Sequence, residues 1–291
     1  LAASEAVDHA RDVTVDLAGP TDVLRGLVED LDRPTVSQVV EADEFLAVDD
    51  DAYDWLIPDL LERGDRLLVT AAEGVGKSNL LRFMALMVAA GLHPFRRVPM
   101  VPRRVLLVDV ENQARKVRRE LRPWLPLVEG WNPGMLAIEV KVGGINLDHA
   151  ADRGWLAGKL AAHRPDLLVI GPLYQLHGAA PRGDTGGENH ARELARTLDR
   201  IRERFGCALL METHAPHGSM GSRDLRPFGS SVWLRWPEFG VGLRVDSDAG
   251  KGVFKVVHWR GPRDRRDFPV RLEYGKPGGW PWVATYRGGG W

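Results

Sequence analysis

The segment that most constrains the fold of this chain is "AAEGVGKS", residues 71–78. The apolar run "RLLVTA" (66–71) leads into it, and "NLLRFMALMVAAG" (79–91), a pattern typical of a buried helix, follows it. A strand, a glycine-containing loop, a Lys-Ser pair and a helix together form a P-loop, whose backbone N–H groups surround a phosphate at the positive end of the helix. Ala71 stands where the motif has its first glycine, a position that requires only a small residue. The sequence therefore predicts a nucleotide-binding site here.

The loop residues have distinct expected roles in binding ATP and Mg²⁺. Backbone N–H groups of residues 73–78 are expected to surround the β-phosphate. Lys77 would neutralise the β- and γ-phosphate oxygens, and the hydroxyl of Ser78 would ligate Mg²⁺. The residues predicted to contact the nucleotide are Glu73, Gly74, Val75, Gly76, Lys77, Ser78 and Asn79.

The rest of the chain favours an α/β fold. Strands are expected at 66–71, 104–110, 136–141, 166–171 and 207–213, and helices at 77–90, 112–121, 149–163 and 188–205. Continuous apolar strands that alternate with helices indicate a mainly parallel sheet covered on both faces. The last third predicts antiparallel strands instead, with a hairpin over 239–260 and a further strand in "FPVRLEY" (268–274).

Charge is distributed unevenly along the chain. Residues 1–65 hold 18 acidic residues and 4 arginines, whereas residues 66–291 hold 35 basic and 22 acidic residues. We expect an acidic lead-in at 1–50, a nucleotide-binding domain at 51–275 and a Trp- and Gly-rich tail at 276–291. The basic part either attracts a polyanion or is an ordinary solvated surface, and charge alone does not decide between these.

Nothing in the composition indicates a membrane or secreted protein. No apolar run approaches the roughly 20 residues that a membrane-spanning helix needs, and residues 1–20 lack the pattern of a signal peptide. The single cysteine, Cys207, lies in the apolar run "CALLM" and is expected to be a buried structural thiol. Since no disulfide can form within the chain, a cytoplasmic location is expected. The tail tryptophans are expected to pack or to contact another subunit; they are Trp280, Trp282 and Trp291.

A P-loop enzyme also needs a carboxylate that activates water and an acid on the metal side. In "DLLVIGPLY" (166–174) the strand ends on Gly171, where a metal-side aspartate is usual. The strand ending in "VDVEN" (108–112) supplies Asp109 and Glu111, two residues apart. Because side chains alternate along a strand, both are expected on one face at the ligand-binding end of the sheet.

Glu111 is therefore expected to be the catalytic base and Asp109 to support the metal in place of Gly171. Water could also complete the Mg²⁺ shell at Gly171, since Mg²⁺ bound to phosphates commonly keeps several waters. The alternative is structural, since acids at strand ends also cap the following helix. Asn112 is expected to cap the helix that starts here.

With these features in place, residues 45–275 resemble the RecA-like ATPases of hexameric replicative helicases, most of all the RepA-like and DnaB-like ATPases of phages and plasmids. The P-loop, the glutamate after the next strand and the late hairpin carry the resemblance. It implies a RecA-like P-loop NTPase core, and it makes 51–275 a helicase-type ATPase domain. Ala71, Gly171 and His258 depart from the pattern of that family.

The resemblance also assigns roles to single residues. The family's catalytic base falls on Glu111, and its γ-phosphate sensor, a histidine at a strand end, falls on His214 in "METHAPHG". An arginine that reaches the ATP of the neighbouring subunit falls on Arg260 in "HWRGPR". The alternatives are that His214 only satisfies a backbone group and that Arg260 only pairs with Asp264 or Asp267.

Two glycine-rich segments, 175–189 and 215–229, each follow a strand at the ligand-binding end. In RecA-like hexamers, loops at these places face the central channel and grip single-stranded DNA. Arg182, Arg223 and Arg226 are therefore expected to contact DNA phosphates without reading sequence. The alternative is two ordinary disordered loops.

Together these features predict an ATP-driven DNA helicase, a homo-oligomer and specifically a hexamer, that translocates on single-stranded DNA. Two alternatives stay open: a RecA-like ATPase that loads or remodels proteins, as recombination mediators do, and a nucleotide-binding scaffold that hydrolyses little. The combination of Lys77, Ser78, Glu111 and Arg260 argues against the scaffold. The acidic lead-in would suit a linker to a primase domain or protein preceding Leu1.

Overall fold

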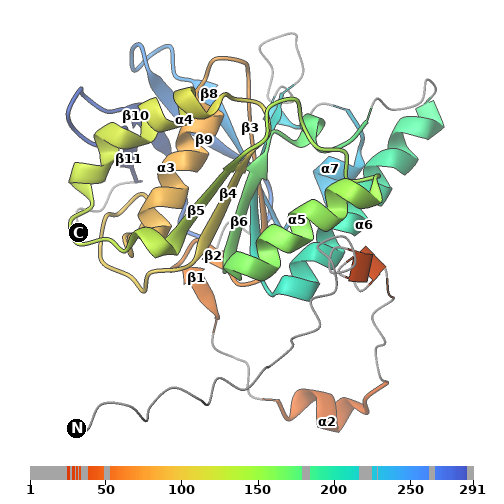
Figure 1. Cartoon of the computed structure of the whole chain (residues 1–291). Coiled ribbons are helices and arrows are strands. Elements are labelled where there is room, and N and C mark those ends of the chain that lie inside the picture. Colours follow the sequence, from red (N-terminus) through yellow and green to blue (C-terminus); the bar gives the residue numbers. More distant parts are fainter. Residues whose placement is uncertain are drawn as a thin grey trace, which may run out of the picture.

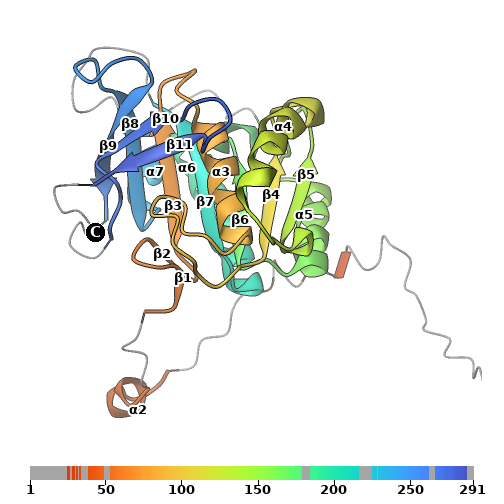
Figure 2. The ribbon, with the colours of Figure 1, turned by 90° about the vertical axis from the view of Figure 1, so that its left-hand side faces the viewer.

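The structure is a computed structural model that describes most of the chain from residue 53 onward. The described residues are 25, 26, 28, 29, 31, 33, 39–48, 53–178, 184–215, 225–227, 229–261 and 266–286. Figure 1 shows a twisted central sheet with helices on both of its faces, and Figure 2 shows the same layers after a quarter turn. The expected α/β fold, with a mainly parallel sheet and antiparallel strands toward the C-terminus, is confirmed.

One nine-stranded sheet organises the described residues, in the order β11-β10-β9-β8-β3-β7-β6-β4-β5. Neighbouring strands are parallel from β8 to β5 and antiparallel from β8 outward to β11. The strands are β3 (Arg66–Ala71), β4 (Val105–Asp109), β5 (Leu136–Val140), β6 (Leu167–Gly171), β7 (Ala208–His214), β8 (Phe239–Val245), β9 (Val253–Arg260), β10 (Arg271–Tyr274) and β11 (Trp282–Thr285). A separate hairpin pairs β1 (Trp55–Ile57) with β2 (Leu61–Glu62).

Helices cover both faces because the parallel strands are apolar on both sides. The helices are α2 (Ala42–Leu46), α3 (Lys77–Ala89), α4 (Ala114–Leu121), α5 (Ala150–His163), α6 (Asp184–Phe205) and α7 (Val232–Arg235). Helices α3 and α4 pack on one face, and α5, α6 and α7 on the other (Figures 1 and 2). Along β3, Leu67 and Val69 pack toward α3, whereas Leu68 packs toward α5 and α6. Every second strand residue therefore faces the P-loop helix.

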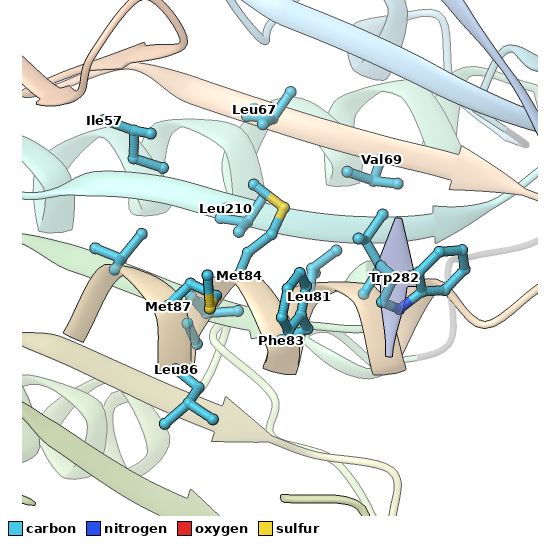
Figure 3. Close-up of a cluster of buried hydrophobic side chains, with 14 of the residues drawn as sticks. Ile57, Leu67, Val69, Leu81, Phe83, Met84, Leu86, Met87, Leu210 and Trp282 are labelled. Atoms are coloured by element: carbon cyan, nitrogen blue, oxygen red, sulfur yellow. The ribbon is translucent and has the colours of Figure 1, made fainter. Parts of the chain in front are cut away.

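The core around α3 is closed by a residue from the far end of the chain. Trp282 on β11 is 1% exposed and packs with α3 residues such as Leu81 and Phe83 (Figure 3). Its indole Nε1 donates a hydrogen bond of 2.9 Å to Oδ1 of Asn79, in the first turn of α3. Strand β11 is therefore tied to the start of the P-loop helix.

The central sheet extends past residue 275, where the sequence places the end of the nucleotide-binding domain. Strand β11 pairs with β10 in register from Arg271↔Thr285 to Tyr274↔Trp282, so the expected tail belongs to the sheet as far as Thr285. Sequence analysis missed this strand because "GKPGGWPWVATY" is short and interrupted by proline and glycine. Trp282 packs in the core as expected and Trp280 packs against it, while Trp291 lies outside the described residues.

Three further expectations from the sequence can be compared with the structure. Helix α6 begins at Asp184, so the second part of the glycine-rich segment 175–189 is helical rather than loop. Cys207 is a buried free thiol as expected, and burial raises its pKa to about 12. None of the described helices combines the length and the apolar character needed to cross a membrane.

Trp282→Ala is expected to lower the free energy of unfolding by about 3–5 kcal/mol, because it leaves a cavity beside α3 and removes a hydrogen bond to Asn79. Urea denaturation followed by circular dichroism measures the effect. The control Val101→Ala, at a side chain that is 63% exposed, should change that free energy by less than about 0.5 kcal/mol. Equal effects of the two substitutions would contradict the role given to Trp282.

Candidate functional site

The predicted P-loop adopts the backbone that phosphate binding requires. The loop joins β3 to α3, and both of its glycines have positive φ, 74° at Gly74 and 87° at Gly76. Space as well as conformation selects glycine at position 76. A Cβ there would lie 2.7 Å from the hydroxyl oxygen of Tyr274 and 3.2 Å from a ring carbon of Trp282. The hydroxyl of Tyr274 also donates to the carbonyl of Val75 at 2.8 Å, so the loop rests directly on β10 and β11.

Lys77 is buried inside the loop. Its ammonium donates to the backbone carbonyls of Ala71, at 3.0 Å, and Ala72, at 3.1 Å, and Nδ1 of His214 lies 3.4 Å away. Burial lowers the pKa of Lys77, and the nearby carboxylates of Glu212, Glu111 and Glu73 oppose that shift. A cation thus stands beside the loop amides, where the phosphates of a nucleotide would lie.

A cleft of about 520 Å³ opens over the P-loop. It brings together most of the residues that the sequence predicts for the nucleotide and its chemistry: Glu73, Gly74, Gly76, Lys77, Ser78, Asn79, Glu111 and His214. It also contains residues to which sequence analysis gave no role in the site: Arg82, Lys116, Glu120, Pro172, Tyr174 and Glu212. Val75, Asp109 and Arg260 do not line it.

Glu111 faces this cleft from the loop after β4. The hydroxyl of Tyr174 donates to Oε1 of Glu111 at 2.6 Å, and the ring of Tyr174 lies 5.5 Å from the ring of His214. Burial and the hydrogen bond to Glu111 together raise the pKa of Tyr174, which keeps its hydroxyl a donor. Glu111 is thus held in the same cleft as Lys77, where it can accept a proton from water.

Asp109 does not line the cleft that Glu111 faces, although the sequence places both at this end of the sheet. Strand β4 ends at Asp109, and the Asp109 side chain is engaged by neighbouring groups of the protein instead. The buried Asp109 carboxylate accepts hydrogen bonds from the backbone N–H groups of Glu111 (3.1 Å) and Asn112 (2.7 Å), and it forms an ion pair with buried Arg82 of α3. With these partners, Asp109 fixes the turn that directs Glu111 into the cleft.

Asn112 is not the helix cap that the sequence predicts. Helix α4 begins at Ala114 after Gln113, and the Gln113 side chain makes no capping hydrogen bond. The Asn112 amide instead donates to both oxygens of Asp109, at 3.2 and 3.3 Å, and its Oδ1 accepts from Lys116 at 2.6 Å. Asn112 therefore belongs to the wall of the cleft.

Glu212 is the functional candidate that sequence analysis missed. It is 5% exposed, it lies on β7 next to the P-loop strand, and it lines the cleft. Burial raises its pKa to about 7, while a hydrogen bond with the Ser78 side chain and the charge of Lys77 act in the opposite direction. An acid inside the apolar run "CALLMET" was the available signal, since a buried carboxylate in a strand requires a partner.

Arg260 lies away from its own P-loop. It pairs in register with Gly240, which is level with Leu68 near the start of β3. Its guanidinium donates to the carbonyls of Pro237 (3.1 Å) and Arg235 (2.9 Å), both of which precede β8.

The acidic partners considered for Arg260 in the sequence are not its partners among the described residues. Asp267 forms an ion pair with Arg96, and Asp264 lies outside the described residues.

The three arginines expected to bind DNA are described only in part. Arg182 and Arg223 lie outside the described residues. Arg226 is exposed, and the carbonyl of the preceding Leu225 accepts a hydrogen bond from Thr70, one residue before the end of β3. This places Arg226 at the ligand-binding end of the sheet.

The residues of this cleft fit a Mg²⁺ ion that is bound together with nucleotide phosphates. No group of three or more His, Cys, Asp or Glu side chains in the described part of the chain could hold a metal by itself. Mg²⁺ bound to a nucleotide, however, commonly takes only one or two protein ligands and shares the rest of its shell with phosphates and water. The Ser78 hydroxyl and the carboxylates that line the same cleft fit that requirement.

Comparison with known proteins agrees with this geometry. A family model described as an AAA domain matches residues 31–220, a range that contains the P-loop, Glu111 and His214 but ends before Arg260. A KaiC-like protein from the hyperthermophilic archaeon Pyrococcus horikoshii OT3 has a similar solved structure, with a TM-score of 0.51 and 18% identity over 77% of this chain and 91% of that one. At this identity the likeness concerns the fold alone. No curated protein matches the chain.

Lys77→Ala is expected to abolish ATP hydrolysis while the fold stays intact, because it removes the cation beside the loop amides. Phosphate release measures the rate, and circular dichroism checks the fold. The control Lys159→Ala removes an equal charge from α5, on the opposite face of the sheet, and should hydrolyse ATP like the wild type. Wild-type turnover by Lys77→Ala would reject this site.

Proposed function

We propose that this chain, which belongs to the AAA domain family, is a ring-forming DNA helicase that couples its ATPase to movement along single-stranded DNA. The RecA-like fold and the P-loop cleft make it an ATPase. The position of Arg260 is the observation that carries the finer proposal, since an arginine at the far end of the sheet from its own P-loop can meet ATP only in a neighbouring copy.

Hydrolysis follows from the groups in the cleft. Loop amides and Lys77 would hold and neutralise the phosphates, and Ser78 would contribute a hydroxyl to Mg²⁺, which supplies further charge neutralisation when bound. Glu111, oriented by Tyr174, would accept the proton of the attacking water. Arg260 of an adjacent copy would stabilise charge that develops on the transferred phosphoryl group.

The end of β7 offers a route from the phosphates to DNA. His214, beside Lys77, is the last residue of β7, and the chain then enters the glycine-rich segment that contains Arg223 and Arg226. A contact between His214 and the γ-phosphate would therefore change the conformation at the start of the segment that binds DNA phosphates. A ring of such subunits would pull single-stranded DNA as its sites hydrolyse ATP in turn.

Single-stranded DNA is expected to stimulate ATP hydrolysis, and the protein is expected to have the mass of a hexamer in solution.

The double variant Arg223→Ala/Arg226→Ala should bind DNA more weakly, whatever the DNA sequence. Its DNA affinity should also depend less steeply on salt, by up to about two phosphate contacts. Fluorescence anisotropy at several salt concentrations measures this. The control Arg200→Ala/Arg204→Ala removes equal charge from the last turns of α6 and should keep the wild-type slope. Stimulation by a protein partner and not by DNA would favour a loader or remodeller instead.

Arg260→Ala is expected to bind ATP normally and hydrolyse it slowly. Mixing it with Lys77→Ala should restore part of the activity, because a mixed ring contains sites with both the lysine and the arginine. Mass spectrometry of the native mixture shows whether mixed rings form, and Arg244→Ala on neighbouring β8 is the control, with near wild-type hydrolysis. Mixed rings without any recovery would make Arg260 a structural residue only.

A further inference from the structure

We propose that Glu212 on β7 supplies the metal-side carboxylate of this site, and that Gly171 is a glycine because the Glu212 side chain occupies its place. The inference deepens the ATPase function proposed above and rests on it. It is independent of the helicase and DNA steps.

The register of β4, β6 and β7 brings Asp109, Gly171 and Glu212 side by side. Asp109 at the end of β4 pairs with Gly171 at the end of β6, and Ile170↔Met211 pairing places Gly171 next to Glu212 on β7. Each of the three positions lies two residues after a strand residue that packs in the core around α3, so the three form a row on the P-loop face of the sheet; those strand residues are Leu107, Val169 and Leu210. In this row, the glycine on β6 lies between an acidic residue on β4 and an acidic residue on β7.

The Glu212 side chain crowds the middle position of this row. A Cβ built on Gly171 would lie 3.1 Å from Cγ of Glu212, tighter than nine in ten real Cβ contacts, and 3.5 Å from the Glu212 backbone nitrogen, so the Glu212 side chain would have to shift. An aspartate at the end of β6 and the present Glu212 rotamer would therefore compete for one volume. Glutamate has one methylene more than aspartate, which lets it cover that volume from the adjacent strand.

The contacts of the Glu212 side chain favour a role in binding Mg²⁺. Its side chain hydrogen-bonds with Ser78, the loop residue expected to ligate Mg²⁺, and Lys77 is the next favourable charge. A carboxylate that is 5% exposed, yet lines the cleft, is costly to bury without compensation. A divalent cation held between Ser78 and the phosphates, with Glu212 beside it directly or through water, would supply that compensation.

The other two carboxylates near the row are engaged elsewhere. Asp109 is bound to Arg82 and to two backbone amides, and it does not line the cleft. Glu111 accepts a hydrogen bond from Tyr174, and its charge opposes ionisation of Glu212 rather than replacing it at Ser78. Glu212 is therefore the acid placed at Ser78, and Glu111 stays available as the base.

The test compares the affinity for ADP with and without Mg²⁺ by isothermal titration calorimetry, so it does not depend on turnover. In the wild type, Mg²⁺ should strengthen binding. Glu212→Gln should bind Mg²⁺-free ADP like the wild type but lose about ten- to hundredfold of the strengthening by Mg²⁺. Asp109→Asn should keep most of that strengthening. The assignment would be overturned if Mg²⁺ strengthened ADP binding by Glu212→Gln as much as by the wild type. It would also be overturned if Asp109→Asn alone lost this effect of Mg²⁺.

Two further variants keep the test decisive if Glu212→Gln fails to fold. Gly171→Ala adds only a methyl group, which should displace Glu212 and reduce the strengthening by Mg²⁺ with no change of charge. Gly171→Asp/Glu212→Ala moves the acid to β6 and should recover strengthening that Glu212→Ala lacks. The proposal would be overturned if Mg²⁺ strengthened ADP binding by Gly171→Ala as much as by the wild type and the double variant showed no more strengthening than Glu212→Ala. Absence of any ADP binding by the wild type would instead reject the ATPase function itself.

Discussion

The register of the parallel strands is the constraint on which this site depends. Backbone pairing of β3, β7, β6 and β4 brings the P-loop, Glu212, Gly171 and Asp109 to one edge of the sheet, although up to about 140 residues separate them along the chain. A slip of one residue in β7 would turn Glu212 into the apolar core beneath α5 and α6 and bring a different side chain to Ser78. The apolar residues on both faces of these strands oppose such a slip. The chemistry of the site is thus fixed by packing well away from it.

Charged groups around α3 are used in two different ways. Arg82 is 2% exposed and pairs with both Asp109 and Glu120, which joins α3, β4 and α4 through one buried guanidinium. Breaking such a buried set by removing one member leaves an uncompensated charge, so it acts as a rigid frame. Lys77 and Glu212 line the same cleft but lie at the loop itself, where Lys77 donates to loop carbonyls and Glu212 hydrogen-bonds with Ser78. The first set holds the wall of the site, and the second lies where the phosphates would bind.

Local features of the site could be predicted from the sequence, and those that arise from distant pairing could not. The P-loop was readable because strand, glycines, lysine and helix are contiguous, and Glu111 follows the next strand directly. The place of Asp109 outside the cleft was hidden because the arginine that engages it, Arg82, comes from α3 and not from the neighbouring sequence. The meaning of Gly171 was hidden because the side chain that fills its place comes from residue 212. The support of the loop by Tyr274 and Trp282 was hidden for the same reason.

That support has a consequence for how the protein becomes functional during its synthesis. Ribosomes release a chain from its N-terminus onward, and the P-loop emerges about 200 residues before the strands that brace it. Until β10 and β11 have emerged, Val75 lacks its hydrogen bond from Tyr274, and the start of α3 lacks the cover of Trp282. The nucleotide loop is therefore among the first parts of the domain to be made and among the last to receive its final shape. A nascent chain that stops at β9 would contain every residue of the cleft and still lack the wall behind it.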